Sequence, residues 1–243
     1  MRKLLYVFLF VFAIGVAVTL KSRSQTQQAR IQELQRSPER GTLKWQVQMA
    51  RAKGESRVII PAPPAEYATN ISSIDQALSY LGMVVAQPIA KNTYLTPAGD
   101  DYEIRTWYKF KVLERLSPGS LPKCATCSYS AELPQELLPI NENEILIDRY
   151  AGTSEIDGMS VTVVDRQIPD FAMGTKYVLL LATDQSGRLG LLRSGPAGIY
   201  GVDPSGTLRP QNPSHSVARE IQTRFNNSLD QLRVYAHQRG VAK

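Results

Sequence analysis

The central part of the chain alternates apolar and polar side chains with the two-residue period of β-strands. In residues 102–116 every second side chain suits a core: Ile104, Thr106, Tyr108, Phe110 and Val112. The side chains between them are mostly charged, so one face is predicted to pack in a core and the other to meet solvent. Four further segments are strand-like: 83–95, 144–152, 159–166 and 176–184. This pattern favours an antiparallel sheet.

Helical spacing is found near the start and at the end of this region. Residues 74–81 place their apolar side chains on one face after Ser73, a suitable N-cap. Residues 216–238 repeat apolar side chains at intervals of three and four, which predicts one amphipathic helix that ends near Gly240. Residues 43–49 alternate apolar and polar side chains and predict a short strand.

The predicted strands recur about every ten residues without long helices between them. This favours a mainly β fold, a small OB-like Greek-key barrel or sandwich with a short N-terminal helix and a C-terminal amphipathic helix. The chain of 243 residues is expected to have three parts: residues 1–24, a membrane anchor or signal segment; residues 25–69, a polar, Pro-containing tether; and residues 70–243, the β-barrel domain with its C-terminal helix.

The N-terminus has the pattern of a targeting segment. Residues 4–20 carry no charge and lie between Arg2-Lys3 and Lys21. Their length lies between a signal-peptide core and a full membrane span. We expect an uncleaved anchor in the bacterial inner membrane, with the body outside the cytoplasm. Secretion after cleavage is the alternative, and the cations after the segment, taken alone, favour the opposite orientation.

The net charge of +6 is unevenly distributed along the chain. Residues 1–60 carry 11 basic and 3 acidic side chains, residues 61–208 carry 11 and 17, and residues 209–243 carry 6 and 2. A basic nucleic-acid-binding domain would carry its cations on the folded body. The expected partners are therefore a membrane, through residues 4–20, and a protein or envelope component, and no nucleic acid.

The two cysteines of the chain, Cys124 and Cys127, form a C-x-x-C segment in a Pro-containing loop. Outside the cytoplasm this spacing favours a small-loop disulfide. A zinc site would need two more ligands, either His215 and His237 or the cysteines of a second chain. A thioredoxin-like redox site would need a helix N-terminus within a βαβ unit, which the pattern does not predict.

Other chemistry has little support in the sequence. The two histidines are far from any candidate nucleophile, and the chain has no G-x-S-x-G elbow, calcium loop or phosphate-binding loop. No catalytic residue, metal ligand or cofactor is therefore predicted. Aromatic side chains could form a binding face on the barrel, with Tyr108, Phe110 and Tyr200 as candidates. Core packing is the alternative for them, and alternation places Trp107 on the opposite face.

Several segments recur in a characteristic order between residues 74 and 209. They are Asp75 to Leu78, Val84 to Pro88, Thr106 to Val112, Cys124 to Cys127, Gly152, Asp157-Gly158, Pro169 to Phe171, Gly174 to Leu181 and Gly195 to Tyr200. This order resembles a pattern of uncharacterised exported bacterial proteins, and the succession of strands and terminal helix resembles the OB-type barrel of netrin-like and metalloproteinase-inhibitor domains. The resemblance implies a barrel and an exported context. It implies no inhibitory activity, because the N-terminal cysteine and multiple disulfides of those inhibitors are missing.

Together these observations predict a membrane-tethered extracytoplasmic module that binds a protein or envelope component. The first alternative is an envelope thiol-disulfide or metal-handling protein that uses Cys124 and Cys127. The second is a hydrolase with its site on the barrel face.

Overall fold

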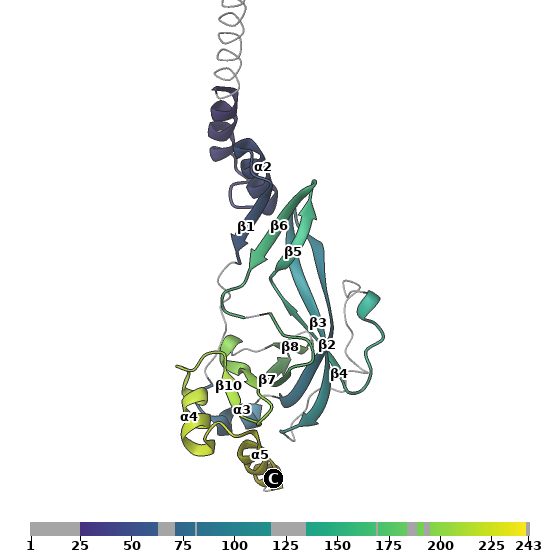
Figure 1. The fold of residues 1–243 in the computed structure, drawn as a ribbon, viewed down its shortest axis with the longest axis vertical. Helices are drawn as coiled ribbons and strands as arrows, with labels where there is room; N and C mark the ends of the chain where they lie inside the picture. Colours follow the sequence, from purple (N-terminus) through teal and green to yellow (C-terminus); the bar gives the residue numbers. More distant parts are fainter. Residues whose placement is uncertain are drawn as a thin grey trace, which may run out of the picture. The chain divides into compact units, whose positions relative to one another are not determined.

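The structure, a computed structural model, describes residues 25–62, 71–80, 82–117, 135–168, 170–183, 189–191 and 195–241. They divide into two compact units (Figure 1). Unit 1 comprises the described residues of 25–60, 95–103 and 153–162, and unit 2 those of 61–94, 104–152 and 163–241. Strands β2 (Gly82–Ala98) and β3 (Asp101–Arg115) contribute residues to both units.

Unit 1 contains helix α2 (Leu43–Lys53) and a three-stranded sheet in the order β1-β6-β5. The bounds of these strands are Arg57–Pro61 for β1, Gly152–Ile156 for β5 and Met159–Val164 for β6. Asp157 and Gly158 join β5 to β6 with positive φ angles of 50° and 76°, the backbone of a tight hairpin turn.

The predicted strand over residues 43–49 is wrong, because these residues form the first part of α2. The Thr42 side chain accepts a hydrogen bond from the Trp45 N–H at 3.1 Å and caps the helix, and Gly54 ends it in the left-handed conformation. Leu43, Val47 and Ala50 are buried at helical spacing. The alternation of apolar residues in this short segment therefore also fits a helical face.

Unit 2 is built on the larger sheet, in the order β10-β9-β7-β2-β3-β4, with β8 also paired to β7. The additional strands are β4 (Glu144–Arg149), β7 (Lys176–Thr183), β8 (Leu189–Leu191), β9 (Ile199–Val202) and β10 (Leu208–Pro210). Two short 3₁₀ helices, η2 (Gln135–Leu137) and η3 (Gly195–Gly198), lie in its connections. The prediction of a mainly β fold is confirmed. The described strands are assigned to two sheets, not to one closed barrel.

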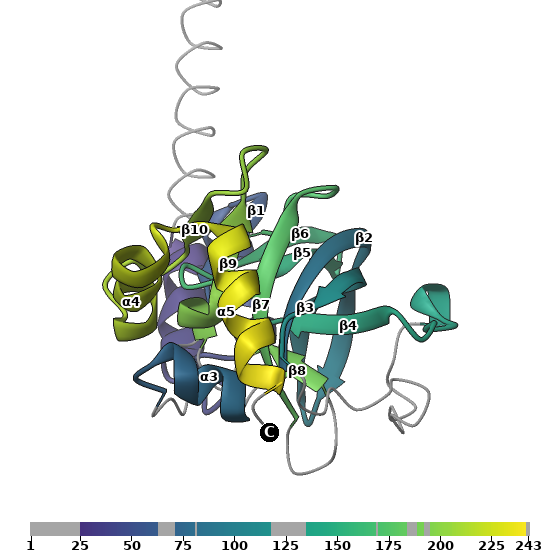
Figure 2. The same cartoon turned by 90° about the horizontal axis from the view of Figure 1, so that it is seen from below.

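Three helices gather beside β9 and β10 (Figure 2). They are α3 (Ile74–Tyr80), α4 (Ser216–Phe225) and α5 (Leu229–Val241). Their buried apolar side chains belong to the same hydrophobic core of unit 2 as the side chains of β7. Helix α3 matches the predicted helix over 74–81. The single helix predicted over 216–238 is wrong, because Asn226 and Asn227 adopt positive φ angles of 48° and 55° and break it.

Two further predictions lack support in the structure. Within the described residues, no helix is long and apolar enough to cross a membrane, and no disulfide-bonded pair occurs among them. The predicted membrane helix and disulfide are therefore not supported by the part of the chain that the structure describes. The anchor predicted at residues 4–20 and the cysteines Cys124 and Cys127 lie outside the described residues.

Candidate functional site

The three aromatic residues considered for a binding face are in the core. Tyr108 and Phe110 are 0% exposed and Tyr200 is 1% exposed. The rings of Tyr108 and Phe110 each meet Phe171 edge-on, with centroids 5.1 Å apart. Such contacts are typical of packed aromatic side chains. None of the three rings presents a face to solvent.

Tyr200 has a buried hydroxyl without a hydrogen-bond partner among the described residues. Burial raises the pKa of Tyr200 above its ordinary value, because the phenolate would lose its hydration. Tyr200 lies opposite Val178 on β7 and Pro210 on β10. This position makes it a core residue of the sheet.

The two histidines lie at the start of α4 and on α5. His215 caps helix α4, where its Nδ1 accepts the Val217 N–H at 3.3 Å. Burial, and then the nearby charge of Arg219, lowers the pKa of His215, which keeps the imidazole neutral as an acceptor requires. His237 lies on α5, 3.8 Å from Glu114. Across the part of the chain that the structure describes, no group of three His, Cys, Asp or Glu side chains is arranged to hold a metal ion.

Asp170 is the centre of a charged cluster that no local sequence pattern predicts. Its carboxylate accepts hydrogen bonds from the Tyr108 hydroxyl, from Lys91 Nζ at 2.9 Å and from Arg149 Nη1 at 3.2 Å. Burial acts to raise the pKa of Asp170, but the bonds from Tyr108 and Lys91 and the charges of Lys91 and Arg149 outweigh it and lower that pKa. The carboxylate is thus held in its charged form.

The donors of this cluster come from three strands of unit 2. Arg149, at the end of β4, is only 8% exposed, and its Nη2 also donates to the Ile168 carbonyl. The cluster therefore fastens the segment between β6 and β7 to the sheet. Directly after Asp170, Phe171 enters the aromatic core, so one short segment is held by both charge and packing.

The outward side of β3 is covered by the chain itself. Trp107 packs with Ile140 against the buried pair Leu137 and Leu146. Lys109 Nζ donates to the Pro139 carbonyl at 2.7 Å. Residues 137–140 therefore cover this side of β3.

An open groove lies at the other end of the sheet, with a volume of about 650 Å³. Its walls come from the start of β7, the end of β9, the following turn, β10 and the first residue of α5. The lining residues are Gly174, Thr175, Lys176, Gly201, Val202, Asp203, Pro204, Gly206, Arg209 and Leu229. This volume is in the range of sites that bind small molecules or short peptide segments.

Asp203 organises the turn that forms one wall. Its Oδ1 accepts from the Ser205 N–H at 3.0 Å, the Ser205 hydroxyl at 2.6 Å and the Thr207 N–H at 2.9 Å. Its Oδ2 accepts from Arg209 Nη2 at 3.3 Å. The bonds from Ser205 and Thr207 lower the pKa of Asp203. The turn Asp203-Pro204-Ser205-Gly206 is thus fixed by hydrogen bonds within the chain.

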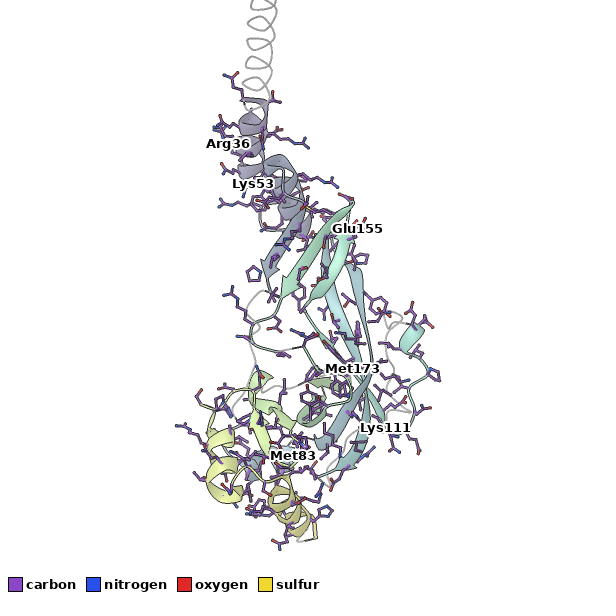
Figure 3. All side chains as sticks on the ribbon, viewed as in Figure 1. Arg36, Lys53, Met83, Lys111, Glu155 and Met173 are labelled. Atoms are coloured by element: carbon purple, nitrogen blue, oxygen red, sulfur yellow. The ribbon has the colours of Figure 1, made fainter. Side chains whose placement is uncertain are left out.

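The opposite wall is tied to β2. The Gly174 N–H donates to the Pro88 carbonyl at 3.2 Å, and Gln87 Nε2 donates to the Gly174 carbonyl. Met173, labelled in Figure 3, is 45% exposed immediately before this point. The groove thus combines polar backbone, two cationic side chains and apolar surface.

Comparison with known proteins gives no family for the chain. No family model matches its sequence, and no curated protein matches it.

Proposed function

We propose that the protein is a non-catalytic binding module that takes its ligand in the groove between β7 and the β9–β10 turn. The observation that carries this proposal is the construction of the groove. Its two walls are held by hydrogen bonds that do not involve a ligand, at Asp203 on one side and at Gly174 on the other. Such preorganisation lowers the entropy lost on binding.

We further propose that the sheet of unit 2 is an OB-like barrel. In its support, β4, β3, β2 and β7 are consecutive neighbours, β8 pairs with β7, and β8 also lies beside β4. This order of five strands returns to its starting strand, as in an OB-type barrel. The location of the body outside the cytoplasm stays a prediction, and the proposed binding function does not depend on it.

Filling the groove tests the proposed function. Gly201 lies between Tyr177 of β7 and Arg209 of β10, and its backbone is compatible with an L-residue. A Cβ at this position would have the Arg209 carbonyl as its nearest neighbour, at 3.9 Å. Gly201→Leu should therefore place a side chain in the groove at little conformational cost.

The experiment pans a random phage-displayed peptide library against the immobilised full chain. The affinity of the enriched peptides is then measured for the wild type and for the variants. We expect binding to Gly201→Leu to be weaker by about tenfold or more, since the added side chain occupies the site. Ser160→Leu, which adds the same side chain at an exposed position of β6, is the control and should bind as the wild type does. Failure to enrich any peptide, or equal binding to both variants, would contradict the proposal.

A further inference from the structure

The groove carries two cationic side chains whose charges are not matched by its lining carboxylate. Lys176 begins β7 and is exposed, and its side chain has no hydrogen bond or ion pair to any residue that the structure describes. Arg209 is 77% exposed at its side chain and makes one bond, at 3.3 Å, to Asp203. Both side chains therefore retain donors for a ligand.

The Asp203 carboxylate is not free to bind a cationic group of a ligand. Three donors of its own turn already use Oδ1, and Arg209 uses Oδ2. Its lowered pKa reflects those bonds, foremost the one from Ser205. The carboxylate has a structural role in the wall, so the lining leaves Lys176 as an unpaired charge.

The charge of the chain beside the groove favours an anionic ligand. Residues 209–243, which supply Arg209 and Leu229 to the lining, carry 6 basic and 2 acidic side chains. In the Asp170 cluster, by contrast, Lys91 and Arg149 already share a carboxylate of the chain. An anionic ligand would therefore be attracted to the groove, where Lys176 and Arg209 give orientation as well as affinity.

The shape and lining of the groove favour a peptide over a phosphate-bearing ligand. Pro204, which is exposed, and the largely buried Val202 and Leu229 line the groove with apolar atoms. Met173 adds an exposed apolar side chain next to Gly174, at the edge of the groove. The lining offers a single guanidinium and a single ammonium, too few for a polyanion, but suited to carboxylates that alternate with apolar side chains.

We infer that the groove recognises an acidic peptide segment, in which carboxylates meet Lys176 and Arg209 and an apolar side chain rests on Val202 and Leu229. This inference rests on the proposed function of the groove. The peptide is not expected to pair with the outer edge of β10, because the Leu208 N–H already donates to the Asn227 carbonyl at 2.6 Å. The segment would lie along the groove and not add a strand to the sheet.

The test measures fluorescence anisotropy of short Glu-Glu-Leu-repeat peptides, labelled with a neutral dye, with the full chain. Gln-Gln-Leu and Lys-Lys-Leu repeats are the matched peptides. We expect the acidic peptide to bind at least about tenfold more tightly than either, and Lys176→Glu to weaken it about tenfold. Lys111→Glu makes the same charge change at an exposed position of β3 and should leave binding unchanged.

The other outcomes separate this inference from the proposed function. If glutamate and glutamine peptides bind equally and both are lost in Gly201→Leu, the groove binds peptides but the acidic class is wrong. If the acidic peptide binds Gly201→Leu and Lys176→Glu as it binds the wild type, both the inference and the groove are contradicted. Lys176→Arg should restore binding to within about threefold, since a cation is kept. Failure of Lys176→Arg to bind would overturn charge recognition.

Discussion

The guanidinium of Arg149, almost entirely buried at the end of β4, donates from Nη1 to Oδ1 of Asp170 at 3.2 Å. The carboxylate itself is on the surface, with 62% of its side chain exposed. A surface carboxylate thus compensates a buried charge, and removing it would leave that charge without its anionic partner. The two residues hold the segment that leads into the groove wall at Gly174.

Asp170→Asn should therefore destabilise unit 2. The amide keeps the shape of the side chain but no longer offers a charge to Arg149 and Lys91, which bind it in the wild type. We expect a loss of about 1–3 kcal/mol in the free energy of unfolding, because a buried donor loses its charged acceptor. Urea denaturation measures this change. Asp165→Asn alters a nearby carboxylate whose Oδ1 accepts the N–H groups of Gln167 and Ile168, and should cost less.

The same contact predicts a dependence of stability on acidic pH. Since the pKa of Asp170 is lowered in the folded protein, its contribution is present above the ordinary pKa of 3.8 and is lost as pH falls through the lowered value. Wild type should lose stability below about pH 4 more steeply than Asp170→Asn. Parallel slopes for the two proteins in denaturation at several acidic pH values would contradict this assignment.

Tyr108 predicts a second dependence, in alkali. Burial and then the hydrogen bond to Asp170 raise the pKa of Tyr108 to about 12. Its contribution to stability is therefore full below the ordinary pKa of 10.0 and lost as pH rises through about 12. Tyr108→Phe should show a weaker fall over this interval. A titration of tyrosinate absorbance should also lose part of its latest phase, to which Tyr94 and Tyr200 contribute as well.

Gly152 is expected to tolerate no side chain. Its φ is 135°, and a Cβ would lie 2.6 Å from both Thr106 Oγ1 and Thr93 Cγ2. Those threonines are hydrogen bonded to each other at 2.9 Å, so they cannot move apart without loss of that bond. Gly152→Ala should lower the free energy of unfolding by about 1–3 kcal/mol, in addition to the cost of its backbone strain. Gly158→Ala, also at positive φ but with no neighbour closer than 4.0 Å, is the control, and equal effects in thermal unfolding would contradict the steric account.

Within unit 1, Asp101 stabilises the start of helix α2. Its carboxylate accepts the N–H groups of Leu43 at 2.7 Å and Lys44 at 3.1 Å. Asp101→Ala should cost about 0.5–2 kcal/mol, the usual effect of removing a helix cap. The adjacent Asp100, which contributes its carbonyl to Lys44 Nζ, provides the control, since Asp100→Ala keeps that carbonyl. Hydrogen exchange of the first turn of α2 should rise in the Asp101 variant alone.

The sequence predicted those elements whose pattern is local. Alternation in β3 correctly placed Tyr108 and Phe110 in the core and Trp107 on the other side. It could not reveal the break at Asn226 and Asn227, because the apolar spacing continues across it; two adjacent asparagines, which tolerate positive φ, were the available signal. For residues 43–49, a short alternating pattern was compatible with both a strand and a helix.

The candidate site could not be assembled from local patterns. Arg149 and Asp170 lie 21 positions apart, and the groove joins β7 to a turn and a helix that follow much later in the chain. One signal was present: Ile145, Ile147 and Arg149 share the inward face of β4, so alternation placed a charged side chain where a core is expected. A buried charged side chain requires a polar or oppositely charged partner. Which residue supplies that partner depends on the path of the chain.

Binding of an acidic peptide segment in the groove at Lys176 is tested most directly by the affinity of the neutral-dye-labelled Glu-Glu-Leu-repeat peptide for the full chain. This affinity is compared between Lys176→Glu and Lys111→Glu. We expect Lys176→Glu to weaken binding about tenfold and Lys111→Glu to leave it unchanged. Equal affinities of the two variants would contradict this expectation.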